Sequence, residues 1–166
     1  MTDDKSAIQG PSDQDLQDLI AENDTGARQP TGTTARILLY VAVAWSLFQL
    51  WLASPLPYVV NFAVFNSTEA RSIHLAFAIF LAFPAFKSSP RNSVPIIDWV
   101  LASIGAFCAL YIYIFYRDLA SRPGLPITQD LAVAGLGLVL LLEATRRALG
   151  PPLMVVAMLF LAYVFF

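Results

Sequence analysis

Histidine and cysteine are almost absent from this chain of 166 residues, which contains one of each, His74 and Cys108. A disulfide within the chain is therefore excluded, and a tetrahedral zinc or iron–sulfur site would have too few ligands. Two axial histidines for a buried haem are also lacking. A hydrolase of the Ser-His-Asp or Cys-His type would depend on His74, which has no orienting partner near it in the sequence. We therefore expect no enzymatic activity, no cofactor and no bound metal.

Charged residues are scarce as well, at 13% of the chain against 57% hydrophobic residues. A soluble domain usually has about 25% charged residues and about 45–50% apolar residues. Nine of the 22 charged residues lie in residues 1–34, and seven of those nine are acidic. Since no basic block with interleaved aromatic residues is present, nucleic acid is not an expected partner. The composition predicts a short acidic tail, residues 1–34, followed by an all-α integral membrane protein surrounded by the lipid bilayer.

Long apolar runs make up most of the chain after the tail. A helix needs about 20 apolar residues to cross a bilayer. A fifth, shorter run at 151–166 would be too short to cross, so we expect it to be the truncated start of a further membrane helix. The prediction is four to five transmembrane segments, with a membrane region over residues 35–150 whose spans are about 37–54, 69–86, 95–116 and 131–149.

Local signals define the ends and faces of these runs. Residues 55–68 carry two prolines and two asparagines, so we expect an interfacial or re-entrant connection rather than a span. Asn66 followed by Glu69 predicts a capped helix start, and Pro84 predicts a kink or an end of that helix. Gly105 and Ala109, four positions apart, would allow another helix to approach closely.

The distribution of basic residues predicts the orientation. With the tail inside the cell, seven basic residues flank the inner ends of the runs and three flank the outer ends. Lysine and arginine are enriched in cytoplasmic loops. We therefore expect a multi-pass protein of the bacterial inner membrane with a cytoplasmic N-terminus.

Ionisable residues inside a span are costly and are the first candidates for function. Arg146 and Arg147 follow Glu143 by three and four positions, so either can share a helix face with it. One interpretation is an internal ion pair whose arginines also reach lipid phosphates, and the other is a proton or anion relay. The first is favoured because the cluster neutralises itself. Asp98 fits an acid in the first turn of a helix better than a proton carrier.

A second group of candidates, Glu69, Arg71 and His74, begins the second run at its outer side. Arg71 and His74 are three positions apart and could meet lipid headgroups, a partner protein or an anion. The simpler interpretation is that these residues only flank a helix start. Gln49 in the first run is expected to hydrogen-bond a neighbouring helix rather than a substrate.

Three stretches of the sequence resemble a known family. They are similar to the front end of fused permeases from tripartite ATP-independent periplasmic (TRAP) transporters of the TAXI type, and the resemblance covers nearly the whole chain. The stretches are AWSLFQLWLASPLP (Ala44–Pro57), FNSTEARSIHLAFAIFLAF (Phe65–Phe83) and LLLEATRRALG (Leu140–Gly150).

In such permeases a four-helix, small-subunit-like region precedes a twelve-helix transport region. The resemblance implies two partners: that transport region, in the same or an adjacent chain, and a periplasmic TAXI-type substrate-binding protein. It also implies ion-driven uptake of organic acids or amino acids, with the small region as a fixed scaffold beside a moving transport region. We expect small-residue faces such as Gly105 and Ala109 to pack against that transport region. The twelve-helix part is missing here, so no ion or substrate site carries over, and Glu143, Arg146 and Arg147 are implied as structural positions at the junction.

The alternative is an independent small membrane protein. It would be either an assembly factor or a small proton-coupled carrier that relies on Glu143 and Asp98.

Overall fold

The computed structural model describes residues 30–86 and 94–165, and these residues form α-helices and no β-strand. The all-α prediction is confirmed for them, whereas most of the acidic tail lies outside the described residues. The helices are α2 (Gly32–Ala53), α3 (Leu56–Val60), α4 (Ser67–Ala85), α5 (Ile96–Ile114), α6 (Tyr116–Ser121), α7 (Thr128–Leu149) and α8 (Pro151–Phe165).

Two of these helices, α2 and α5, are long and apolar enough to cross a membrane. Helices α4 and α7 occupy the other two expected spans to within three residues at each end. The expected span 95–116 is divided, because α5 ends at Ile114 and the short helix α6 begins at Tyr116. The number of four to five crossings stays a prediction.

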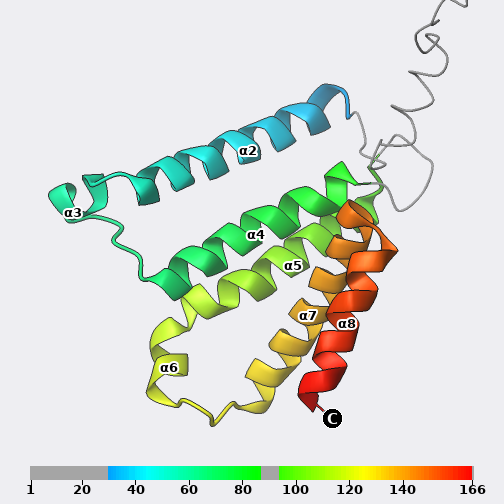
Figure 1. Ribbon diagram of the computed structural model, residues 1–166. Coiled ribbons are helices and arrows are strands. Elements are labelled where there is room, and N and C mark those ends of the chain that lie inside the picture. Colours follow the sequence, from blue (N-terminus) through cyan, green and yellow to red (C-terminus); the bar gives the residue numbers. More distant parts are fainter. Residues whose placement is uncertain (1–29, 87–93, 166) are drawn as a thin grey trace, which may run out of the picture.

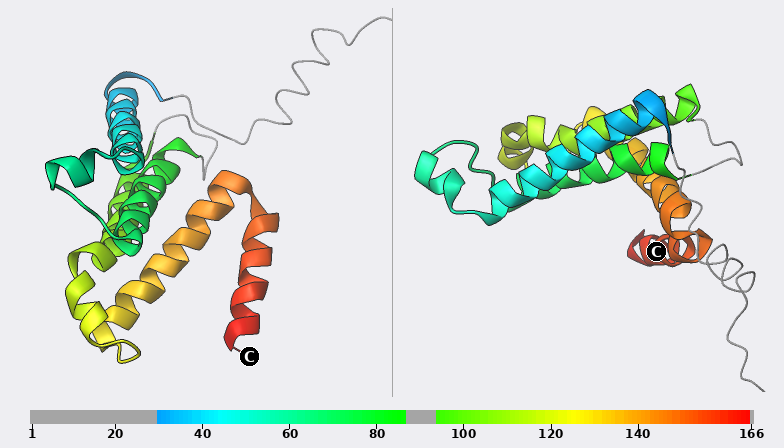
Figure 2. Two further views of the ribbon diagram at one scale, coloured as in Figure 1. Left: turned by 60° about the vertical axis from the view of Figure 1, so that its left-hand side comes forward. Right: turned by 90° about the horizontal axis from the view of Figure 1, so that it is seen from above.

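The helices alternate in direction along the chain. The start of α2, the end of α4, the start of α5 and the turn between α7 and α8 lie at one end of the molecule, and α3 and α6 lie at the other (Figure 1). Helices α4 and α5 pair along their lengths, and α7 crosses them and contacts both. Helix α2 lies along α4, and α8 turns back from the end of α7 and diverges from it along its length (Figure 2).

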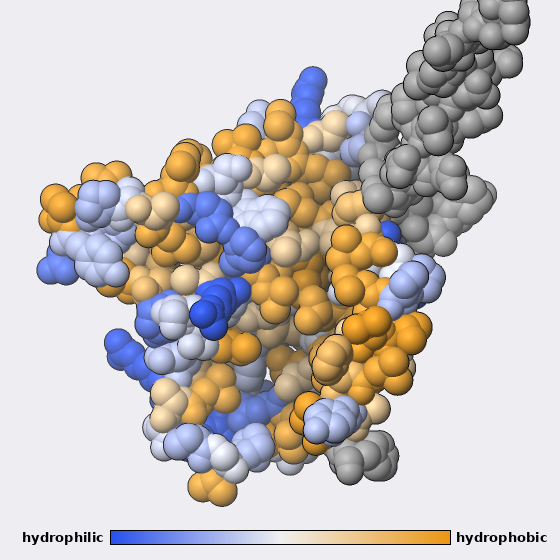
Figure 3. All heavy atoms as spheres, viewed as in Figure 1, coloured by the Kyte–Doolittle hydropathy of each residue, from blue (hydrophilic) through white to orange (hydrophobic). Residues whose placement is uncertain are grey.

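The core lies between α4, α5 and α7. Helix α2 has no buried residue, and most large apolar side chains of α2 and α8 lie on the surface. The face shown in Figure 3 is accordingly largely apolar over these two helices. The buried core consists mostly of small and aliphatic residues, namely Ala76, Ile79, Phe83, Ala102, Ala109, Leu140 and Ala144.

Gly105 of α5 packs tightly against α4. A Cβ atom at this position would lie 2.5 Å from Cγ2 of Ile79 and 3.7 Å from Cβ of Leu140. Any larger residue would therefore force Ile79 to move. Gly105 and Ala109, one turn further along, are both buried in the chain's own core. The expectation that this face packs against a separate transport region is therefore wrong, because α4 and α7 already cover it.

Helix α4 begins at the predicted cap. Oδ1 of Asn66 accepts hydrogen bonds from the backbone N–H groups of Thr68 and Glu69, both at 2.9 Å. Oε2 of Glu69 in turn accepts from the backbone N–H of Asn66 at 2.9 Å. This reciprocal arrangement satisfies donors that have no partner inside the helix. The helix ends one residue after Pro84, as a proline near a helix end favours.

The connection between α2 and α4 contains the short helix α3. It ends at Asn61, whose φ of 56° places it in the left-handed region that asparagine tolerates better than most residues. The chain then turns back toward α2, where Nε1 of Trp51 donates to the backbone oxygen of Ala63 at 3.3 Å. The depth of this connection in a membrane stays a prediction.

Candidate functional site

A network of four charged side chains joins α5 to α7 near the end of the molecule where these helices respectively begin and end. Glu143 accepts a hydrogen bond from Nε of Arg146 at 2.7 Å and from Nε of Arg147 at 2.7 Å. Nη1 of Arg147 extends to the neighbouring helix and donates to Oδ1 of Asp98 at 2.7 Å. The structure therefore brings together the four charged residues that the sequence marked as ion-pair candidates.

The exposure of the side chains in this network increases from the interior to the surface. The side chain of Asp98 is 0% exposed and that of Arg147 is 6% exposed, whereas Arg146 is 43% exposed. The guanidinium carbon of Arg147 also lies 4.9 Å from the ring centroid of Phe83 on α4, within range of a cation–π contact. Arg147 thus contacts groups on both of the other core helices.

This arrangement is suited to holding helices rather than to moving protons. A buried ion pair is tolerated when its geometry is good and its hydrogen bonds are satisfied. Asp98 and Glu143 both accept from guanidinium groups, which stay protonated in proteins. Since a guanidinium group cannot take up and pass on a proton, the geometry favours the ion-pair interpretation of Glu143 over the relay interpretation.

A second polar cluster lies at the opposite end of the molecule and was not predicted from the sequence. The phenol of Tyr111 donates to Oδ1 of Asp130 at 2.7 Å. Nη1 of Arg122 lies 2.9 Å from Oδ2 of Asp130, and the backbone N–H of Ile127 donates to Oδ2 at 3.1 Å. The cluster ties the end of α5 and the loop after α6 to the first turn of α7.

The surroundings of Asp130 favour its ionised form. The hydrogen bond from Tyr111 is the largest cause that holds the pKa of this carboxyl below its ordinary value, with further contributions from Ile127 and Arg122. Burial acts in the opposite direction but does not reverse the shift. Asp130 therefore serves as a charged acceptor that fixes the helix start.

The structure does not gather Glu69, Arg71 and His74 into one site. Glu69 is part of the cap of α4, and Arg71 is exposed. His74 lies one turn further along and contacts α2, where Nε1 of Trp45 donates to its Nδ1 at 3.2 Å and the amide nitrogen of Gln49 contacts the same atom. The expected bond from Gln49 to a neighbouring helix is confirmed.

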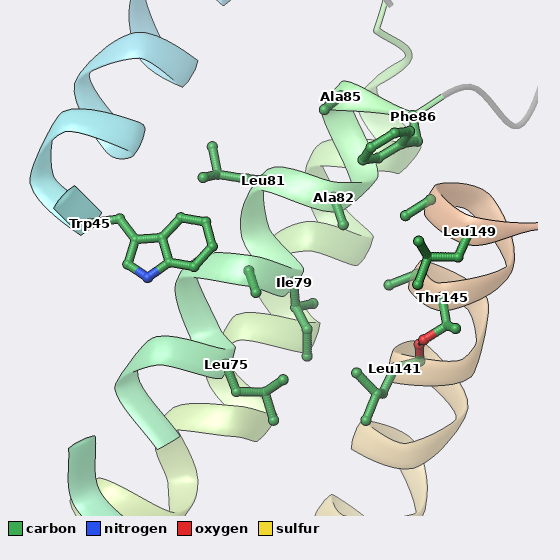
Figure 4. A pocket seen from close by; sticks show the side chains of 13 residues that line it. Trp45, Leu75, Ile79, Leu81, Ala82, Ala85, Phe86, Leu141, Thr145 and Leu149 are labelled. Atoms are coloured by element: carbon green, nitrogen blue, oxygen red, sulfur yellow. The ribbon is translucent and has the colours of Figure 1, made fainter. Parts of the chain in front are cut away.

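An apolar groove of about 320 Å³ runs between α4 and α7, with Trp45 of α2 at its side (Figure 4). Leu75 and Ile79 line it from α4, and Leu141 and Leu149 line it from α7. Thr145 also borders the groove, but its hydroxyl donates to the backbone oxygen of Leu141 at 2.8 Å. The groove therefore suits an apolar surface better than a charged ligand.

Within residues 30–86 and 94–165, no group of three or more His, Cys, Asp or Glu side chains is placed to hold a metal ion. No protein-family model matches the chain, and no curated protein or solved structure is significantly similar to it.

Proposed function

We propose that this chain is the small-subunit-like membrane scaffold of a TAXI-type TRAP permease, a secondary active transporter of the bacterial inner membrane. The observation that carries the proposal is the resemblance of Ala44–Pro57, Phe65–Phe83 and Leu140–Gly150 to the front end of such permeases. The apolar helices α2 and α5 support a membrane location. The N-terminus would be cytoplasmic, as the distribution of basic residues favours.

The packing supports a fixed scaffold. Gly105 lies so close to Ile79 that α4 and α5 interlock, and a packed core resists sliding because small displacements create clashes or voids. The buried pair of Arg147 and Asp98 joins α7 to α5. Sliding of one helix past the other would separate these charges in the interior, at a large cost in free energy.

The working parts of the transporter would lie outside these 166 residues. On this proposal, a twelve-helix transport region in the same or an adjacent chain holds the substrate and ion sites. A periplasmic TAXI-type binding protein would deliver an organic acid or amino acid for symport with an ion. The apolar groove between α4 and α7, together with the exposed side of α8, offers surface against which a transport region could pack.

The alternative role as a small proton-coupled carrier would require Glu143 or Asp98 to bind and release a proton. Both carboxylates accept hydrogen bonds from arginine side chains, and a guanidinium group is a donor that cannot take up a proton from them. The geometry thus favours the scaffold. The following experiment distinguishes the scaffold from an assembly factor.

The test is purification of the tagged chain from detergent-solubilised native membranes, followed by mass spectrometry. We expect a large multi-span permease region, either covalently continuous with the chain or co-purifying with it. A photo-crosslinker at Leu149, which lines the groove and is 65% exposed, should give a product with that region. The control position is Tyr58 on α3, which is 73% exposed and should not. Recovery of a stable 166-residue chain alone would contradict the proposal.

A further inference from the structure

Helix α2 contacts α4 through a small patch around Phe77, besides its contacts with the connecting segment at Ala63 and Phe65. The rings of Trp45 and Phe77 stack with centroids 6.4 Å apart, and Phe48 approaches Phe77 at 6.0 Å. No residue of α2 is buried. Because little apolar area is withdrawn on docking, a single polar contact can carry a large share of the attachment.

That polar contact is made to one ring nitrogen of His74. Nε1 of Trp45 donates to Nδ1 at 3.2 Å, and the side-chain nitrogen of Gln49 contacts the same Nδ1. An indole N–H is a donor only. Nδ1 must therefore be the unprotonated nitrogen, and the neutral imidazole carries its hydrogen on Nε2.

We infer that His74 is a proton-controlled latch between α2 and α4, closed when the imidazole is neutral and open when it is charged. Protonation of Nδ1 would direct an N–H at the N–H of Trp45, and neither group can accept. Gln49 can turn its amide and offer its oxygen instead. Trp45 is therefore the partner that makes the contact sensitive to protonation.

His74 is exposed and lies one turn after the exposed Arg71, near the start of α4. Arg71 is the charged neighbour on the same helix. The residues that α2 places against the imidazole, Trp45 and Gln49, are uncharged. Histidine is the side chain most often used as a switch in the physiological pH range.

The packing around the patch leaves room for α2 to move. A cavity of about 290 Å³ lies beside it, lined by Val41 of α2, Phe77 of α4 and Leu110 of α5 among others. The groove between α4 and α7 reaches Trp45 on the other side. Because the contact is flanked by space on both sides, loss of the hydrogen bond can shift α2 without disrupting the core. This latch does not depend on the proposed transporter role.

The experiment measures the distance between α2 and the core in the full chain. Spin labels are attached to cysteines at Leu47 on α2 and Val139 on α7, which are 60% and 63% exposed, in a Cys108→Ala background. Distance distributions are recorded in lipid nanodiscs at pH 8 and pH 5. At pH 8 one distance between the labels should predominate. We expect the population with that distance, relative to populations with other distances, to fall roughly two- to tenfold at pH 5, as the loss of one hydrogen bond implies.

Three variants assign the effect. His74→Gln cannot become charged and should give the same distribution at both pH values. Trp45→Phe removes the clashing donor and should be insensitive to pH as well, and it carries the test if His74→Gln does not fold. Arg71→Gln should keep the full response. An unchanged wild-type distribution, an equal shift in His74→Gln, or a full shift in Trp45→Phe would overturn the latch.

Discussion

Arg147 of α7 donates a hydrogen bond across 2.7 Å to Asp98 of α5, and the two side chains are 6% and 0% exposed. The residues are 49 positions apart in the sequence, so the contact exists only because α5 and α7 pack together. A charge withdrawn from water in this way is stable only in the presence of its partner. The pair should therefore be among the most sensitive positions in the membrane region.

Replacing Arg147 with methionine should lower the free energy of unfolding by about 3–5 kcal/mol, since it removes the positive charge that faces a buried carboxylate. The matched control is Arg146→Gln, because Arg146 binds the same Glu143 but is 43% exposed. That change should lower the free energy of unfolding by about 1 kcal/mol or less. Denaturant unfolding in detergent measures both.

Adding Asp98→Asn to Arg147→Met should recover part of the lost stability, because the double variant leaves no buried charge at this position. Equal losses in the two single arginine variants would contradict the role of burial that we assign to Arg147.

Replacing Gly105 with leucine should destabilise the protein by about 1–3 kcal/mol or more, since overpacking forces neighbouring side chains and helices apart. Even the first added carbon would lie 2.5 Å from Cγ2 of Ile79. In the proposed transporter the variant should also lower uptake while the protein stays in the membrane. Gly135→Leu is the control, because a Cβ atom at Gly135 meets nothing within 4 Å. Normal uptake and stability in Gly105→Leu would refute the packing argument.

Replacing Asn66 with alanine should lower stability by about 1 kcal/mol, because the side chain accepts two backbone hydrogen bonds at the start of α4 and such caps contribute that amount. Thermal unfolding followed by circular dichroism measures the loss. The neighbouring change Ser67→Ala, at an exposed position that is not the cap, should leave the midpoint within experimental error, and a similar fall in both variants would argue against capping.

The ionisation of Asp130 should make the stability of the fold depend on pH. Its pKa is held below the ordinary value in the folded protein, chiefly by Tyr111. Ionised Asp130 therefore stabilises the fold above the ordinary carboxyl pKa of about 3.9, and this contribution is lost as the pH falls through the lowered value. Asp130→Asn should be less stable at neutral pH and should lose less stability on acidification than the wild type.

Unfolding midpoints measured from neutral pH down to about pH 2 test this expectation. Asp118→Asn on the exposed part of α6 is the control and should keep the acid dependence of the wild type. An unchanged dependence in Asp130→Asn would show that the carboxylate is not held as the structure indicates.

Much of the fold could be predicted because its signals are local. Apolar runs determined where the helices lie, and the pair Asn66 and Glu69 predicted the cap of α4 from a spacing of three residues. The pairing of Glu143 with Arg146 and Arg147 follows from helix geometry in the same way. None of these features requires knowledge of how one helix meets another.

The features that could not be predicted depend on packing between helices. Asp98 was interpreted as an acid in a first helical turn, which it is, but its contact with Arg147 follows from the pairing of α5 and α7. Tyr111 and Asp130 are 19 positions apart, on either side of a loop whose path the sequence does not specify. A buried tyrosine needs a hydrogen-bond partner, and this requirement was the one available signal for the cluster of Tyr111, Arg122 and Asp130.

The distribution of buried residues has a consequence for how the chain can be divided. Each described residue of the hydrophobic core belongs to α4, α5 or α7, and both polar clusters lie on these helices and the connections between them. The described residues between Asn66 and Gly150 thus contain this core and both polar clusters. Helices α2 and α8 are peripheral modules, which insertion, loss or replacement during evolution could alter while the central three-helix unit kept its architecture.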